Sequence, residues 1–359
     1  MSDIKYNQYG YVGLKNIGNT CFLNSCLQAL SHTPELNKLL DNKKKLHNNG
    51  DGIILDEWNE LRQLIWTNNG VISPNKFVRS IQNVAKEKSR HLFTGWSQND
   101  ISEFLLFIIE CLHNSISRSV DVNINGKNEH SVDALAIKCY THLKGIYAKE
   151  YSEINELFYG MQVTELLSID KSIKHSTNVE QYFIIDLPLP DKQNIDIYDC
   201  FDLYTIDEKM EGDNAWFNDK TNTKEDIIKR IRFWNLPNIL VITFSRFSFN
   251  GKTKRNDNIL FPLDDLDLSK YVCGYKPSSY KYELYAVCNH SGNVYMGHYT
   301  AFIKNYTDNW FLFNDENVKK VDNQQSIITP MATPWDSPKV LILKSCPKVL
   351  PAIGVKITF

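Results

Sequence analysis

Residues 13–25 read Gly13-Leu14-Lys15-Asn16-Ile17-Gly18-Asn19-Thr20-Cys21-Phe22-Leu23-Asn24-Ser25. Apolar residues then recur at helical spacing, which predicts a helix that begins at Cys21, and Pro34 marks either its end or the start of the next helix. We expect Asn19 or Thr20 to cap it. A sulfur at a helix start lies at the positive end of the helix dipole, which favours the thiolate. Cys21 is therefore a candidate nucleophile, and the alternative is a buried, inert thiol.

Two segments almost three hundred residues later can supply partners for such a thiol. If the hairpin that carries them is symmetric about Tyr306, His298 lies directly across from Asn314, with Cβ atoms about 5 Å apart. Asn314 could then accept the imidazole N–H and hold the tautomer, which completes a nucleophile, a base and an orienting amide. Asp315 falls on the opposite strand face by simple alternation, and whether it supports the site or replaces Asn314 stays open. The alternative for His298 is a strand histidine bonded to a backbone carbonyl.

Acyl transfer also requires hydrogen-bond donors for the oxyanion of the tetrahedral intermediate. The backbone N–H of Cys21 is available at a helix start. Asn16 could bring its side-chain amide to the same point across the turn at Gly18, although an ordinary turn residue is the common alternative.

Composition narrows the class of protein. The chain has 359 residues and a net charge of −2, so no global field attracts nucleic acid or an anionic membrane, and we expect neither as a partner. Eight cysteines occur without a Cys-x-x-Cys pair, and no apolar signal core or long apolar stretch is present. We therefore expect reduced thiols and a cytoplasmic or nuclear location.

The period of the apolar residues changes along the chain. The first 150 residues indicate helices, including segments 54–66 and 101–112, and from about residue 157 the pattern indicates strands. A helical lobe followed by a strand-rich lobe argues for an α+β fold with the cleft between lobes. The strands expected in a mostly antiparallel sheet are 182–188, 238–244, 282–287, 298–303, 310–313 and 340–343.

Five segments resemble the catalytic domain of the ubiquitin-specific protease family, the papain-like deubiquitinases with thumb, palm and fingers. Segments 13–30, 285–304 and 310–318 resemble the family's Cys box, His box and third-residue box, and segments 98–105 and 236–247 resemble its acidic thumb helix and central palm. The resemblance implies one catalytic domain over residues 1–345, followed by a tail at 346–359. It places the thumb at about 10–155, the fingers at about 157–235, and the palm at about 180–190 and 236–345.

The resemblance also implies residue roles. Cys21 would be the nucleophile, His298 the general base, Asn314 the orienting residue and Asn16 the oxyanion donor, with Asp315 as the alternative to Asn314.

A second set of roles concerns the substrate. Asp100 and Glu103 would face the arginines of the ubiquitin tail, and carboxylates on one helical face do suit arginine. Tyr299 and Phe247 would line a channel that admits only Gly-Gly, beside a loop that ends at Gly297. The alternative for the two carboxylates is helix-start acidity, which needs no partner.

The chain departs from the family pattern in its fingers and in the loop before His298. Many members carry two Cys-x-x-Cys pairs that bind zinc, whereas the corresponding positions here are Ser168, Lys171, Asn218 and Thr221. We therefore expect no metal and no cofactor, and fingers held by packing alone. Met296 replaces the first glycine of the usual Gly-Gly.

The expected activity is hydrolysis of the (iso)peptide bond after the C-terminal glycine of ubiquitin, through a Cys-His-Asn triad and a thioester. The expected partners are ubiquitin and ubiquitinated proteins. Two alternatives stay open: a catalytically weak ubiquitin-binding module, and a protease for a ubiquitin-like modifier.

Overall fold

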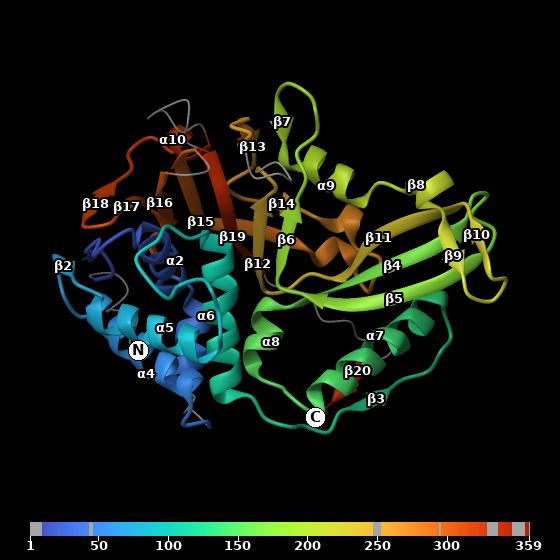
Figure 1. Ribbon diagram of the computed structural model, residues 1–359, viewed down its shortest axis with the longest axis horizontal. Coiled ribbons are helices and arrows are strands. Elements are labelled where there is room, and N and C mark those ends of the chain that lie inside the picture. Colours follow the sequence, from blue (N-terminus) through green and yellow to red (C-terminus); the bar gives the residue numbers. More distant parts are fainter. Residues whose placement is uncertain are drawn as a thin grey trace.

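A computed structural model describes residues 9–42, 46–246, 253–293, 296–328, 337–346 and 356–358. The first half is mainly helical, as the apolar periodicity predicts (Figure 1). The predicted helix begins at Cys21, and Pro34 opens the next one, because proline is well suited to a first helical turn. The helices of this lobe are α2 (Cys21–Ser31), α3 (Pro34–Asn42), α4 (Gly50–Ile65), α5 (Asn75–Glu87), α6 (Ile101–Ile116), α7 (Ser131–Tyr147) and α8 (Glu153–Phe158).

Helix α2 is buried along its whole length, packed against α6 and against a strand of the sheet described next. Its polar residues are therefore satisfied within the protein: the Gln28 side chain donates to the Val12 carbonyl at 2.7 Å, and Asn24 donates to the Leu14 carbonyl at 3.2 Å. A buried polar group must keep such partners, so these bonds fix the helix and the loop before it. The start of α2 is thus held by the core of the lobe.

The second half builds an eight-stranded sheet in the order β18-β17-β16-β15-β19-β12-β6, with β14 beside β15. Every pairing is antiparallel except that between β12 and β6, which confirms the mostly antiparallel prediction. The apolar stretch 239–244 is fully buried in an interior strand, which lies between β19 and the edge strand β6. The strands are β6 (Ile184–Leu187), β12 (Ile239–Phe244), β14 (Leu266–Asp267), β15 (Lys281–Gly292), β16 (Gly297–Lys304), β17 (Trp310–Asn314), β18 (Asn317–Lys320) and β19 (Ser337–Ser345).

A second sheet, which we call the outer sheet, projects away from the helical lobe, on the right in Figure 1. It has the order β5-β4-β11-β8 and a small β9–β10 hairpin beyond it. A helix, α9, interrupts the region that the sequence indicated as polar and strand-like. The elements are β4 (Gly160–Ser168), β5 (Lys174–Tyr182), α9 (Ile197–Thr205), β8 (Glu208–Met210), β9 (Trp216–Asn218), β10 (Thr223–Glu225) and β11 (Ile227–Asn235).

The outer sheet lies in the segment expected to form the fingers. The expectation that packing alone holds this segment is wrong. The Asp207 carboxylate, beside β8, pairs with Lys171 at 2.7 Å and with Arg230 at 2.7 Å. Such a shared carboxylate links the β4–β5 turn to β11 and therefore ties the strands together at a position away from the core. In the part of the chain that the structure describes, no cluster of three or more metal-ligating side chains occurs.

Short elements complete the fold. The expected tail contacts the rest of the chain, because its strand β20 pairs antiparallel with β3, close to α7 (Figure 1). Among the described residues, no helix combines the length and the hydropathy needed to cross a bilayer. The remaining elements are β1 (Gly13–Leu14), β2 (Val71–Ile72), β3 (Asn123–Asn125), β7 (Ile195–Asp196), β13 (Ile259–Leu260), α10 (Gln325–Ile328) and β20 (Lys356–Thr358), with 3₁₀ turns at Gly212–Asn214, Ser269–Tyr271 and Pro277–Ser279.

Candidate active site

Cys21 is the first residue of α2, and its side chain is almost fully buried. The expected side-chain cap is absent: Thr20 occupies the cap position with φ −92° and ψ 12°, and its hydroxyl does not accept from the first turn. That hydroxyl instead accepts from the Ile17 N–H at 3.1 Å. A helix start without a side-chain acceptor directs its N–H groups towards an external anion, which is the geometry that an oxyanion requires.

His298, on β16, lies between the Cys21 sulfur and Asn314. Its Nε2 is 2.8 Å from Asn314 Oδ1, which leaves Nδ1 as the ring nitrogen available to the sulfur. The hydrogen bond with Cys21 is the main cause that raises the pKa of His298 to about 9, against the lowering effect of burial, and Asn314 adds to the rise. An imidazole with this pKa carries a proton at neutral pH and can stabilise a thiolate beside it.

The hairpin that joins His298 to Asn314 has a different register from the symmetric one expected. Ala301 pairs with Phe313 and Ile303 with Phe311, so the hairpin is centred one residue later than Tyr306. Paired positions therefore shift by two, which keeps both residues on the same face because the strand period is two. His298 consequently reaches Asn314 along a diagonal.

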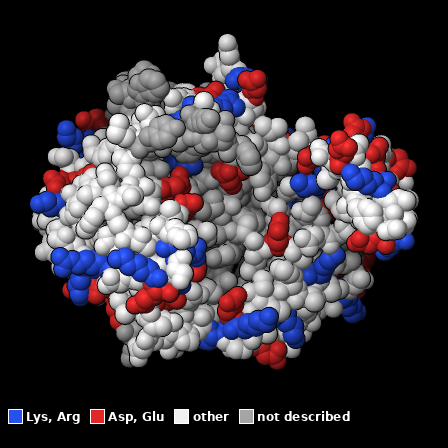
Figure 2. Space-filling model, viewed as in Figure 1, with Lys and Arg blue, Asp and Glu red and all other residues white. Residues whose placement is uncertain are grey.

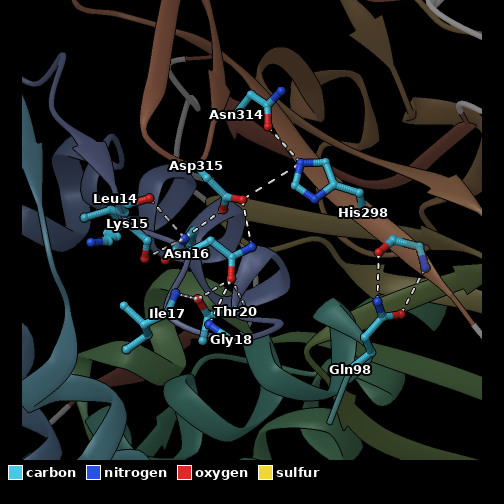
Figure 3. A network of polar contacts seen from close by, with 12 residues as sticks. Leu14, Lys15, Asn16, Ile17, Gly18, Thr20, Gln98, His298, Asn314 and Asp315 are labelled. Carbon is cyan, nitrogen blue, oxygen red and sulfur yellow. Dashed lines mark hydrogen bonds and ion pairs between the residues drawn. The ribbon is translucent and has the colours of Figure 1, made fainter. Parts of the chain in front are cut away.

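Asp315 also faces the site, contrary to the alternation argument. It begins the two-residue connection between β17 and β18 with φ 47°, and this left-handed conformation ends the strand alternation. Its carboxylate accepts from Asn16 Nδ2 at 2.9 Å and from Asn24 Nδ2 at 2.7 Å, and lies 4.0 Å from His298 Nε2 (Figure 3). Asp315 thus joins the loop before Cys21 to the hairpin that carries Asn314.

The orientation of the Asn16 amide is set by the backbone around it. Its Oδ1 accepts from the N–H groups of Gly18 at 3.2 Å and Thr20 at 3.1 Å, so Nδ2 points the other way, towards Asp315 (Figure 3). Because the amide nitrogen carries two hydrogens, one remains for another acceptor. The Asn16 amide therefore has one hydrogen that its bond with Asp315 does not use.

A close main-chain contact with the turn at Asp315 also holds the loop before Cys21 in place. A Cβ atom added at Gly13 would lie 2.2 Å from the Glu316 carbonyl oxygen, and the Leu14 N–H donates to the Asp315 carbonyl at 2.9 Å. Only glycine permits this approach. The turn at Asp315 and the loop before Cys21 are thus fitted together by main-chain contact as well as by side chains.

A cavity of about 270 Å³ lies beside Cys21. Figure 2 shows acidic side chains around the hollow on this face of the molecule. The residues that line the cavity come from the helical lobe, from β15 and β16, and from the loop between these two strands: Asn19, Cys21, Phe22, Gln98, Asn99, Asp100, His290, Asn293, Gly297 and Tyr299.

The chain matches a family model and is similar to known proteins. The family model for ubiquitin carboxyl-terminal hydrolase matches residues 12–343. The chain belongs to this family. It is 33% identical over 331 residues to human Ubiquitin carboxyl-terminal hydrolase 2, covering 88% of this chain and 53% of that protein. It is 32% identical over 346 residues to human Ubiquitin carboxyl-terminal hydrolase 21, covering 88% of this chain and 59% of that protein. The chain thus spans little more than half the length of these relatives.

Family membership confirms the resemblance to ubiquitin-specific proteases and the papain-like α+β fold. The cavity beside Cys21 is lined by three of the residues predicted to contact substrate, namely Asp100, Gly297 and Tyr299. Phe247 lies outside the described residues.

The two predicted acidic residues differ in their surroundings. Asp100 caps α6, accepts from the N–H groups of Ser102 and Glu103, and lies 3.5 Å from the ammonium of the nearly buried Lys339. The bonds to the first turn fit the helix-start alternative, and Lys339 gives the charge a further partner within the chain. Glu103 is exposed one turn along and forms no ion pair with any described residue, so it is the more accessible carboxylate.

Sequence reasoning overlooked Asn24 and Gln98, which both contact the site. Asn24 had a signal, because it lies three residues after Cys21 and is polar within an apolar helix. Gln98 had none beyond its place in segment 98–105, since its contact is made across the cleft with Gly297.

Proposed function

We propose that this chain is a thiol-dependent deubiquitinase that hydrolyses the (iso)peptide bond after the C-terminal glycine of ubiquitin. The observation that carries the proposal is the place of His298, with the Cys21 sulfur on one side and the Asn314 amide on the other. This is the arrangement of nucleophile, base and orienting group that thiol hydrolases require. Membership of the ubiquitin carboxyl-terminal hydrolase family supports ubiquitin as the substrate class.

The first chemical step is acylation. The Cys21 thiolate attacks the carbonyl carbon of the terminal glycine, and negative charge develops on the carbonyl oxygen. The Cys21 N–H and the spare Asn16 hydrogen donate to that oxygen. His298 then gives its proton to the lysine nitrogen as the C–N bond breaks, which releases the amine and leaves a thioester.

The second step is hydrolysis of the thioester. Neutral His298 takes a proton from a water molecule, and the resulting hydroxide adds to the thioester carbonyl. Collapse of this second tetrahedral intermediate expels the Cys21 thiolate beside the His298 imidazolium, which restores the starting ion pair. Asn314 holds the ring through both proton transfers, whereas Asp315 acts on Asn16 and Asn24, so we assign the orienting role to Asn314 and a supporting role to Asp315.

We further propose that the substrate tail lies in the cavity beside Cys21, along Tyr299 and Gly297. Glu103 and Asp100 would attract a basic tail, with Glu103 the more accessible of the two. The pairing of Asp100 with Lys339 reduces the charge that it can offer. Phe247 retains its expected role in the channel as part of this proposal.

The setting that suits this chemistry is a reducing, cytoplasmic or nuclear one. All eight cysteines are free thiols in the structure, and an oxidised Cys21 could not act as a nucleophile.

The test is hydrolysis of a fluorogenic amide at the C-terminus of ubiquitin, with Cys21→Ala and Cys346→Ala as matched variants. We expect Cys21→Ala to lose turnover while it still binds ubiquitin, and Cys346→Ala, which changes a thiol away from the site, to keep it. Electrophilic probes built on ubiquitin and on ubiquitin-like modifiers are then compared. Absence of a Cys21 adduct would favour a binding module, and preference for another modifier would change the substrate.

A further inference from the structure

The segment immediately before α6, Trp96–Gln98, touches both halves of the site, and we call it the strap. On one side, Asn19 Nδ2 donates to the Trp96 carbonyl at 2.8 Å. The Trp96 ring also lies over Gly18, where an added Cβ would be 3.1 Å from the ring. The strap is therefore attached to the loop that leads into Cys21.

On its other side, the strap is bonded to the strand that carries His298. Gln98 Nε2 donates to the Gly297 carbonyl at 3.1 Å, and Gln98 Oε1 accepts from the Gly297 N–H at 3.0 Å (Figure 3). One carboxamide thus binds both main-chain polar groups of one residue, as a neighbouring strand would.

This pairing compensates for a gap in the sheet. The ladder between β16 and β17 begins at Ala301, so within the described ranges no strand pairs with the outer edge of β16 around His298. Gln98 bonds the main chain at that edge, and Asn314 bonds the His298 ring. An unpaired strand end is the part of a sheet that moves most easily, so these two bonds restrict the segment that bears the base.

A second side chain, that of His290, also lies close against Gly297. A Cβ atom there would lie 2.1 Å from His290 Nε2, and the His290 ring in turn packs against Tyr299 with centroids 4.7 Å apart. The main chain that enters His298 is therefore held between Gln98 and His290. A change at Gln98 alters one of these two restraints while the other stays in place.

We propose that Gln98 is a positioning residue, which sets the distance between Cys21 and His298 by joining the loop of one to the strand of the other. The inference rests on the function proposed above, and it goes beyond the residues assigned to the chemistry there. Because the strap is exposed, with Trp96 51% exposed, its bonds compete with water and contribute modestly.

The experiment compares three variants in steady-state hydrolysis: Gln98→Ala, Gln98→Met and Gln82→Ala. Gln98→Met keeps the length of the side chain without its hydrogen bonds. Gln82 is the matched control, because its amide donates to the Gly95 carbonyl at 3.0 Å and so holds the same connection without touching Gly297. We expect both Gln98 variants to lose about tenfold in kcat, equivalent to about 1.4 kcal/mol, with KM within about twofold of the wild type. Gln82→Ala should keep wild-type kcat.

A second readout does not depend on ubiquitin. Alkylation of Cys21 by iodoacetamide, followed on the Cys21 peptide by mass spectrometry, reports the thiolate directly. Since a displaced His298 stabilises the thiolate less, we expect the pH midpoint of alkylation to rise in both Gln98 variants. If the wild type failed to hydrolyse any ubiquitin substrate, the proposed function would be lost, and alkylation would still test Gln98.

Three results would overturn the inference. An unchanged kcat with an unchanged alkylation midpoint would show that the bond to Gly297 does not position His298. A rise in KM alone would make Gln98 a substrate contact. A lower melting temperature with wild-type kcat and alkylation would make it structural only.

Discussion

Replacement of Asp315 by asparagine tests how the two lobes of the site are joined. The carboxylate accepts one hydrogen bond from Asn16 and one from Asn24, and asparagine offers only one oxygen for these two donors. Asn24 is 2% exposed, whereas Asn16 can turn towards water. We therefore expect the new amide to keep its oxygen towards Asn24 and to face Asn16 with its NH₂ group, which displaces Asn16.

The magnitude follows from the bonds that are lost. A hydrogen bond to a charged group contributes about 1.5–3 kcal/mol. If about half of this stabilisation, about 0.75–1.5 kcal/mol, is needed only when the oxyanion forms, kcat falls about three- to thirteenfold. KM should change little, because no contact with the bound substrate is removed. The pKa of His298 should also fall, since the Asp315 charge helps to raise it.

The assay is steady-state hydrolysis of a ubiquitin C-terminal amide across pH, with Glu316→Gln as the control. Glu316 is exposed in the same turn, so this variant removes an equal charge next to Asp315 without touching Asn16 or Asn24. Wild-type kcat in Asp315→Asn, together with an unchanged alkaline limb, would refute the role given to the carboxylate. A loss shared equally by Glu316→Gln would mean that general charge, and not the two amides, is responsible.

Three further predictions concern other parts of the chain. Asn314→Ala removes one cause of the raised His298 pKa, so the alkaline limb of kcat/KM, expected near pH 9 in the wild type, should move to lower pH; an unmoved limb would contradict the pairing. Burial lowers the pKa of His32 to about 4, below its value of about 6.5 in an unfolded chain, so its contribution is complete above pH 6.5 and is lost as the pH falls towards 4. Urea unfolding should register a loss of about 3 kcal/mol across this range, and His32→Gln should flatten the slope. Asp207→Asn releases Lys171 and Arg230 in the outer sheet and should lower stability by about 0.5–1.5 kcal/mol, whereas a chelator should leave the melting temperature of the wild type unchanged.

Short-range patterns predicted much of the fold. The helix at Cys21, the helix start at Pro34 and the strands around 239–244 and 298–303 each follow from residues that are close in sequence. The shared face of His298 and Asn314 was also predicted, because an error of two residues in register leaves a period-two face unchanged. These features depend on local spacing, which the sequence displays directly.

The finer geometry depends on side-chain bonds that local spacing does not reveal. The Asn305 side chain accepts from the N–H groups of Thr307 and Asn309, and this turn centres the hairpin at Thr307 instead of Tyr306. The left-handed backbone at Asp315 likewise reflects its fit against Gly13 and Leu14, almost three hundred residues away. Such contacts are set by tertiary structure, so the direction of the Asp315 carboxylate could not be deduced from strand alternation.

The placement of these cross-links bears on whether the site is aligned or silent. Misaligned loops that separate the nucleophile from the base would leave a ubiquitin-binding module without activity. Here the loop before Cys21 is joined to the hairpin of Asn314 through Asp315, and to the start of β16 through the strap and Gln98. The two joints lie on different sides of His298, so a movement that separates the base from the thiol must break at least one of them. Each joint consists of exposed or half-buried hydrogen bonds of modest strength. These bonds favour the alignment of Cys21 with His298 and still allow the cleft to open for a substrate tail.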